Sequence, residues 1–246
     1  MKAFEFFSAK RQQFAQRAQA AFAQYKEAKK QRGMTLLEVI IVLGIIGTIA
    51  AGVVVLAQRA FDSRTVSEVV QSTNTVRVAI KEAYASSGSY PDYNSPLTLD
   101  NTTILTSTNG GATSALVKLG RVSVAEMRNK ISGDFYGIGA GSTVAAGTGG
   151  QLNKKGYVIE VNGLTAEQCR NILTQVGNNW DYVEVANAAA GAYTLNGTKD
   201  MTVATNDTTI LRSLNATNGI KNITPDIIVG TCSNGGASNS IILGSR

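Results

Sequence analysis

One carboxylate stands inside an apolar segment near the start of this chain. Glu38 follows a basic stretch and precedes 19 residues, Val39 to Ala57, that carry no charge. As a helix, these 19 residues would extend roughly 28 Å, close to the hydrocarbon thickness of a bilayer. An ionised group inside such a span costs about 2.5 to 3.5 kcal/mol and is usually kept for pairing or function. We therefore expect Glu38 to pair with a cation in apolar surroundings.

The residue types that most catalytic and metal sites need are scarce. The 246 residues include no histidine, the commonest general base and metal ligand, and only two cysteines, too few for a closed zinc site. We expect no catalytic residue, no metal and no cofactor, and hence no enzyme. The 43% hydrophobic content is that of one globular domain with extensions rather than of a disordered chain.

The positive charge of the chain is concentrated at its start. Residues 1–33 hold eight Lys/Arg and two acidic residues, which accounts for the whole net charge of +6 and leaves 15 basic and 15 acidic residues after them. Without residues 1–33 the chain is neutral, so we expect no nucleic-acid partner. Low self-repulsion favours self-association.

The basic leader also sets the expected membrane topology. Lysines and arginines before the apolar run predict a cytoplasmic leader, residues 1–33, and export of everything after Ala57. An alternative is an ordinary secretory signal cleaved near Ala50-Ala51-Gly52, which would remove the apolar run.

Export would place the two cysteines, Cys169 and Cys232, in an oxidising compartment. We expect them to pair, closing a loop of 63 residues and stabilising the fold by roughly 4 kcal/mol. The alternative is two unrelated buried thiols.

A single long helix is expected to carry Glu38. No proline occurs between Met34 and Tyr90, so an apolar part, residues 34–57, can continue into an amphipathic part, residues 58–86. Small residues in the apolar part permit close helix approach, although glycine is also simply common in membrane helices. These packing candidates are Gly44, Gly47, Ala51 and Gly52. One face of the amphipathic part is expected to be buried: Phe61, Val66, Val69, Val70, Thr73, Val76, Ile80, Ala83 and Tyr84.

Residues 87–246 are expected to form an α+β head, in which the long helix packs on an antiparallel β-sheet with additional short helices. Capping boxes predict two helices, and β-rich or capped segments predict the other elements. Gly137 to Gly150 is interpreted as a flexible loop. The expected helices are residues 124–131, 166–176, 207–214 and 225–229, and the expected strands are residues 156–161, 182–185, 240–243 and, as a further candidate, 193–195.

The run Gly33-Met34-Thr35-Leu36-Leu37-Glu38 before a long apolar helix, with two cysteines enclosing the C-terminal part, resembles the type IV pilins. The long leader and the methionine after glycine are similar to the type IVb class. The resemblance implies the pilin fold and a prepilin peptidase that cleaves between Gly33 and Met34 and methylates Met34. It also implies that Cys169 and Cys232 delimit a variable surface region, residues 169–232.

The resemblance further implies the major structural subunit of a surface filament that serves adherence, bacterial aggregation and colonisation. The amine of Met34 in an incoming subunit would pair with Glu38 of a neighbour. The subunit would start in the bacterial inner membrane, with a periplasmic head, and end in an extracellular pilus. The implied partners are other copies of the chain, prepilin peptidase, the assembly platform with its ATPase and a minor pilin, and a host surface or neighbouring pili.

Two other functions remain open: a minor pilin or type II secretion pseudopilin, and an anchored exported protein that never polymerises. Among the aromatic residues of the head, packing is favoured over sugar binding. These residues are Tyr90, Tyr93, Trp180 and Tyr182.

Overall fold

The structure is a computed structural model that describes residues 35–147 and 150–246. The predicted leader and the Gly33–Met34 junction lie outside the described residues. Contacts divide the chain into two compact units, with the division after Ala57.

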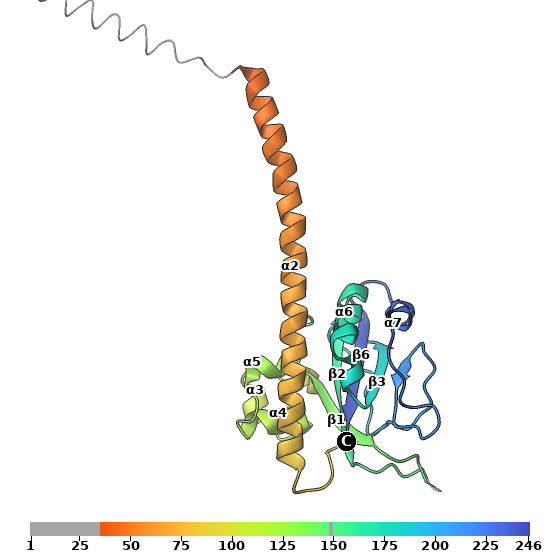
Figure 1. The fold of residues 1–246 in the computed structure, drawn as a ribbon. Helices are drawn as coiled ribbons and strands as arrows, with labels where there is room; N and C mark the ends of the chain where they lie inside the picture. Colours follow the sequence, from red (N-terminus) through yellow and green to blue (C-terminus); the bar gives the residue numbers. More distant parts are fainter. Residues whose placement is uncertain (1–34, 148–149) are drawn as a thin grey trace, which may run out of the picture. The chain divides into compact units, whose positions relative to one another are not determined.

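Helix α2 runs from Leu36 to Tyr84, 49 residues without interruption (Figure 1). It forms because no proline interrupts it and because its amphipathic part has a face to bury. The part of α2 before Gln58 is long and apolar enough to cross a membrane, and none of its most apolar window is buried. The predicted apolar helix is therefore present, and its large side chains are exposed in the single chain.

In the second unit, the amphipathic part of α2 packs against the head. Most of the predicted face is buried or partly buried, but Phe61 is 67% exposed, so its assignment to that face was wrong. Phe61 lies five residues before Val66, the first buried residue of α2. The buried residues of α2 are Val66, Val69, Ser72, Thr73, Val76, Ala79 and Ile80.

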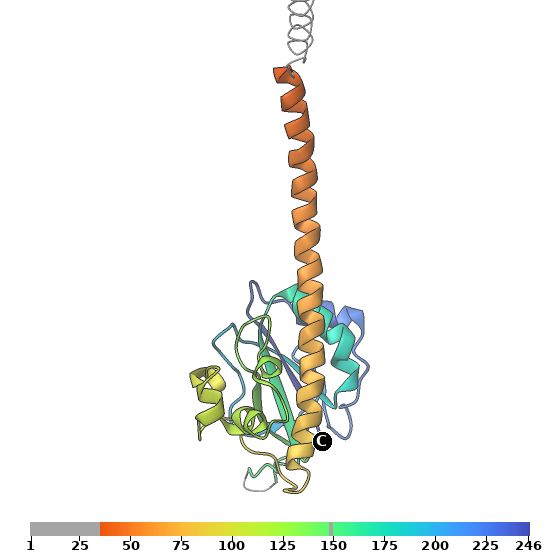
Figure 2. The same ribbon diagram turned by 90° about the vertical axis from the view of Figure 1, so that its left-hand side faces the viewer.

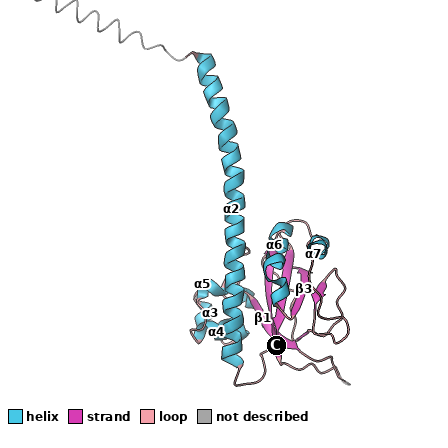
Figure 3. Cartoon of the chain, in the orientation of Figure 1, coloured by secondary structure: helices cyan, strands magenta, loops and turns pink. Residues whose placement is uncertain are grey.

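Among its described residues, the head contains one six-stranded sheet in the order β4-β1-β2-β6-β3-β5. Figure 3 draws the strands in magenta. The strands are β1 (Gly137–Ser142), β2 (Gly156–Leu164), β3 (Tyr182–Asn187), β4 (Lys199–Asp200), β5 (Ile210–Arg212) and β6 (Asn239–Ser245). Four of the five pairings are antiparallel, but β4 pairs with β1 in parallel, so the sheet is mixed rather than purely antiparallel. The three strands predicted at 156–161, 182–185 and 240–243 are confirmed.

The two faces of the sheet bury different segments, because successive side chains of a strand point to opposite sides. Tyr157, Ile159 and Val161 of β2 belong to the large core, which also contains the buried residues of α2 and of α6 (Ala166–Val176). Figure 2 shows α2 and α6 in front of the same sheet. Val158 belongs to a second, smaller cluster on the other face. Residues 188–201, which we call the strap, contribute Leu195 and Met201 to that cluster.

Short helices occupy the connections. Before β1 these are η1 (Pro96–Thr98), α3 (Thr103–Thr106), α4 (Gly111–Lys118) and α5 (Val124–Met127); after β2 they are α6, η2 (Gly177–Asn179) and α7 (Pro225–Thr231). Both predicted capping boxes form, at Ser123 with Glu126 and at Thr165 with Gln168. The helix predicted over 124–131 ends at Met127, and α4 was not predicted. Thr224 precedes α7 as expected, although its side chain makes no capping hydrogen bond.

Three local predictions were wrong. The glycine-rich segment beginning at Gly137 contains strand β1 rather than only flexible loop. Residues 207–214 contain β5 rather than a helix, because the Asn206 side-chain oxygen accepts hydrogen bonds from the amides of Thr208, Thr209 and Ile210. Residues 193–195 are not a strand, because two of their amides bind the carboxylate of Glu160.

Candidate functional site

Glu38 lies in the first turn of α2 and is exposed in the single chain. Its amide donates to the hydroxyl of Thr35 (3.3 Å) and to the Thr35 carbonyl (2.9 Å), and the Val39 amide donates to the same carbonyl (3.2 Å). Thr35 is thus the capping residue at the start of α2. This cap was not predicted, although Thr35 and Glu38 have the same spacing as the two predicted capping boxes.

No lysine or arginine occurs in the chain between Met34 and Gln58. Within the described residues, no ion pair involves Glu38; the first ion pair of α2 joins Arg64 to Glu68, 3.0 Å apart and exposed. No basic residue of the described apolar part of α2 can therefore pair with Glu38.

The surface around and after Glu38 is apolar. Its large exposed side chains are Leu36, Leu37, Ile40, Ile41, Val42, Leu43, Ile45, Ile46, Ile49, Val53, Val54, Val55 and Leu56. A Cβ added at Gly44, Gly47 or Gly52 would meet no atom within 4 Å. These three glycines therefore lie on open helix surface, and their role in packing between helices stays a prediction, as does that of Ala51.

Cys169 and Cys232 form a disulfide with a Cα–Cα distance of 6.0 Å, and both are fully buried. Cys169 lies in α6, and Cys232 directly follows α7. The Arg170 guanidinium adds a second link, because it donates to the carbonyl of Cys232 (3.1 Å). The disulfide and this hydrogen bond tie the end of the cysteine-enclosed region to the helix where the region begins.

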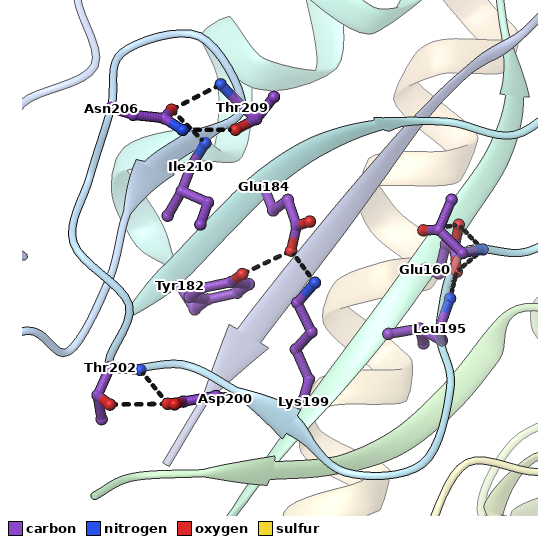
Figure 4. A network of polar contacts seen from close by, with 11 residues as sticks. Glu160, Tyr182, Glu184, Leu195, Lys199, Asp200, Thr202, Asn206, Thr209 and Ile210 are labelled. Atoms are coloured by element: carbon purple, nitrogen blue, oxygen red, sulfur yellow. Dashed lines mark hydrogen bonds and ion pairs between the residues drawn. The ribbon is translucent and has the colours of Figure 1, made fainter. Parts of the chain in front are cut away.

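Glu160 holds the strap to the sheet. This glutamate of β2 is fully buried, and its carboxylate accepts hydrogen bonds from the amide and hydroxyl of Thr194 and from the amide of Leu195, all at 2.9 Å (Figure 4). A buried carboxylate is tolerated when donors surround it. This contact was not predicted, although a single acid within the apolar run of β2 indicates a buried carboxylate that needs donors.

Alternate glycines of β1 make room for side chains that cross the sheet. A Cβ would lie 2.9 Å from the Tyr193 ring at Gly137 and 2.7 Å from Cβ of Tyr93 at Gly139. At Gly141 it would lie 2.8 Å from the end of Met201. Side chains on this face of β1 would displace the strap and the segment at Tyr93. The glycines therefore serve close packing here rather than loop flexibility.

A polar cluster borders the smaller core. Lys199 of β4 forms an ion pair with Glu184 of β3 at 2.5 Å, and the Tyr182 hydroxyl donates to the same carboxylate oxygen (Figure 4). Burial, and then the neighbouring Glu184 carboxylate, raise the pKa of Tyr182 far above its ordinary value of 10. Tyr182 stays protonated and acts as a donor. Lys199 thus joins the strap to β3.

The four aromatic residues considered for sugar binding take part in packing. Trp180 and Tyr182 are buried, while Tyr90 and Tyr93 are half-buried and pack against the two apolar clusters. The guanidinium of Arg77 from α2 lies 4.5 Å from the centre of the Trp180 ring and donates to the carbonyl of Asn179 (2.9 Å). Packing, the role predicted for these residues, accounts for their positions.

The chain has a long helix with an acid in the first turn of its apolar part, and a head with a mixed sheet and one disulfide. This is the architecture of a type IV pilin. A solved structure supports this class: TcpA, a type IV pilin from Vibrio cholerae El Tor biotype, matches 74% of this chain and 99% of its own, with a TM-score of 0.55. At 24% identity, that likeness shows the fold alone.

Two family models match the sequence: the toxin-coregulated pilus subunit TcpA over residues 115–243 and the prokaryotic N-terminal methylation motif over residues 28–54. A toxin coregulated pilin of Vibrio cholerae is 41% identical over 165 residues, 67% of this chain and 66% of that relative. One from Vibrio cholerae serotype O1 is 40% identical over 162 residues, 66% of this chain and 65% of that relative. The aligned part thus spans just under two thirds of these relatives' length. The chain belongs to the toxin-coregulated pilus subunit family, within the type IVb pilins.

Proposed function

We propose that this chain is the precursor of the major structural subunit of a type IVb pilus and has no enzymatic activity of its own. Residues 1–33 are the leader, residues 34–57 the membrane and assembly segment, residues 58–86 the helix that carries the head, and residues 87–246 the head. Prepilin peptidase removes the leader between Gly33 and Met34 and methylates Met34. The match of residues 28–54 to the methylation motif supports this processing.

The single observation that carries the proposal is Glu38, exposed on a helix that has no basic residue before Arg59. Cleavage creates an ammonium group at Met34, and a methylated secondary amine keeps that charge. When the amine of one subunit meets Glu38 of another, the pair offsets several kcal/mol of desolvation for each charge. Because no other charge lies in that helix part, this contact also sets the axial register.

Burial of the apolar helix surface supplies cohesion. The exposed leucine, isoleucine and valine side chains between Leu36 and Leu56 lose their lipid contacts as the subunit leaves the inner membrane. Contact with the same segment of neighbouring copies removes them from water. Each helix meets a different surface on its neighbour, so the assembly is open and grows as a filament rather than a closed ring.

The proposed pathway begins with a prepilin in the inner membrane, its leader cytoplasmic and its head periplasmic, and ends in an extracellular filament. It requires the assembly platform, its ATPase and a minor pilin. In the filament, the cysteine-enclosed region, residues 169–232, contributes to the surface that meets host cells or neighbouring pili, which is the basis of adherence and colonisation.

The test replaces Glu38 by glutamine and compares surface filaments with wild type. Glu68→Gln is a matched control, since Glu68 is an exposed glutamate of the same helix whose partner is Arg64. We expect Glu38→Gln to be processed and disulfide-bonded at wild-type levels but to form few or no filaments, and Glu68→Gln to assemble normally. Normal filament numbers in Glu38→Gln would remove the pairing role.

The copy number in filaments separates a major subunit from a minor pilin or a secretion pseudopilin. We expect this chain to be the dominant protein in filaments sheared from cells. A trace amount beside another, dominant pilin would favour the minor-pilin function, and its absence from surface filaments would favour a pseudopilin.

A further inference from the structure

An asparagine followed by a glycine can modify itself without an enzyme. The backbone nitrogen of the glycine can attack the side-chain carbonyl carbon of the asparagine, because glycine has no Cβ to obstruct the approach. The sequence contains five such pairs, all of them in the head. They are Asn109-Gly110, Asn162-Gly163, Asn196-Gly197, Asn218-Gly219 and Asn234-Gly235.

Packing restrains two of the five pairs. Asn162 is 1% exposed, and its side-chain nitrogen, which would have to leave, donates to the Asp134 carboxylate (2.7 Å). Gly110 is buried beside Asn109, and a Cβ built there would lie 2.2 Å from Cβ of Ser114. Such close packing leaves the Gly110 nitrogen no room to turn toward the asparagine side chain.

Hydrogen bonds fix the backbone of two other pairs. The Asn218 carbonyl accepts from the Thr205 hydroxyl (2.6 Å). At Asn234, the side chain of Asn239 accepts from the backbone amide (3.2 Å) and donates to the backbone carbonyl (3.1 Å). Ring closure rotates the peptide group that carries this carbonyl, so both pairs are expected to react slowly in the folded chain.

The pair Asn196-Gly197 lies in the strap and lacks all of these restraints. Asn196 is exposed, and a Cβ built at Gly197 would meet no atom within 4 Å. Among the described residues, neither member of the pair has a hydrogen-bond partner. The Asn196 side chain and the Gly197 nitrogen can therefore rotate toward each other.

We propose that Asn196 is a site of spontaneous deamidation in the folded head and reacts before the other four asparagines. The Gly197 nitrogen attacks the side-chain carbonyl carbon of Asn196, and the new bond closes a succinimide ring. The Asn196 side-chain nitrogen leaves as ammonia, taking up the proton of the Gly197 amide. Water then opens the ring at one of its two carbonyls, which leaves aspartate or isoaspartate. The reaction consumes water alone.

The modification places a negative charge between two fixed points of the strap. On one side the Leu195 amide donates to the Glu160 carboxylate (2.9 Å), and on the other the Thr198 hydroxyl donates to Asp92 (2.7 Å). The isoaspartate form also lengthens the backbone between them by one carbon atom. Because residues 34–246 hold 15 basic and 15 acidic residues, one further acid gives the chain without its leader a formal charge of −1. The charge of a copy therefore changes with its age.

The experiment incubates the purified full chain in detergent at mildly alkaline pH and separates its charge forms over time by isoelectric focusing. Mass spectrometry of tryptic peptides locates each conversion, and the peptide that ends at Lys199 contains Asn196-Gly197 as its only pair of this kind. The variants are Asn196→Ser and Asn234→Ser. The second is the matched control, because it makes the same replacement in another asparagine–glycine pair. We expect the first acidic form of wild type to be lost in Asn196→Ser and kept in Asn234→Ser.

The same incubation in urea shows whether the folded chain sets the order. We expect the five pairs to convert at similar rates once the chain is unfolded. If Asn196 also reacts first by the same ratio in urea, the local sequence sets the order and the inference is overturned. Conversion at Asn196 no faster than at the other four asparagines of the folded chain would overturn it too. Neither result involves filament assembly, so neither bears on the proposed function.

Discussion

Removal of the Glu160 carboxylate tests how the strap is held on the sheet. In Glu160→Leu the side chain keeps a similar volume but offers no acceptor to the strap. The Leu195 amide, now buried without a partner, costs about 1 to 3 kcal/mol, and the more exposed donors of Thr194 add roughly 1 kcal/mol. We therefore expect the free energy of unfolding to fall by about 2 to 4 kcal/mol.

Glu160→Gln keeps one acceptor oxygen, so its free energy of unfolding should lie between those of wild type and Glu160→Leu. Glu167→Leu, an exposed position in α6, should change the unfolding free energy by less than about 0.5 kcal/mol. The assay is urea unfolding of the full chain in detergent, followed by the fluorescence of Trp180, the only tryptophan and a buried one. A Glu160→Leu protein as stable as wild type would refute the role assigned to this carboxylate.

Three further changes probe the head. Gly139→Ala should lower the free energy of unfolding by about 1 to 3 kcal/mol, because the added Cβ meets backbone atoms of the segment at Tyr93. At Gly147 the added Cβ meets no atom, so Gly147→Ala should leave the same urea unfolding curve unchanged. Replacement of both Cys169 and Cys232 by serine should lower the unfolding free energy by roughly 4 kcal/mol, and an unchanged urea midpoint would contradict this. Hydrogen bonds from a lysine and a threonine hold the pKa of Asp92 below its ordinary 3.8, so its stabilisation is present above that pH and lost as the pH falls through the folded value. Asp92→Asn should therefore lose less stability than wild type when acid titrations are extended below pH 3.8; equal losses would count against the contact.

The features that the sequence predicted well are those with local causes. The long helix follows from an uninterrupted run without proline, and α6 follows from Thr165, Gln168 and the apolar positions behind them. Strands β2, β3 and β6 are rich in β-branched and aromatic residues and are buried throughout most of their length. The cysteine pair followed from the compartment expected for an exported chain.

The wrong predictions have causes that lie far along the chain. β1 resembled a loop because its glycines leave space for Tyr93, Tyr193 and Met201, which come from segments tens of residues away. The segment around Tyr193 to Leu195 has strand-forming residues, but Glu160 of β2 binds its amides. Non-local partners of this kind override local propensity.

The candidate site divides in the same way. Glu38 and the cysteines could be found because each is an isolated residue of unusual type in its surroundings. The spacing of Thr35 and Glu38 indicates the cap, but Glu38 was interpreted only as an assembly residue. The strap could not be found, since its attachment depends on side chains of β2, β3 and β4 that only the folded sheet brings together.

The strap changes the interpretation of the cysteine-enclosed region. The part of the cysteine-enclosed region between β3 and β4 crosses one face of the sheet. The Glu160 carboxylate, the Lys199 ion pair and the apolar contacts of Met201 hold it there. Within this region, sequence variation is therefore expected at exposed positions of residues 202–221 rather than at Lys199 and Met201. The disulfide holds the ends of the region, and the strap holds its middle.

The central claim is that cleavage at Gly33–Met34 creates the cation that pairs with Glu38 in a filament built from the apolar helix. Intact-mass and N-terminal analysis of subunits from shed filaments tests it most directly. We expect a chain that begins at methylated Met34, retains residues 34–57 and contains the disulfide. Filament subunits that still begin at Met1, or that lack the apolar helix, would contradict it.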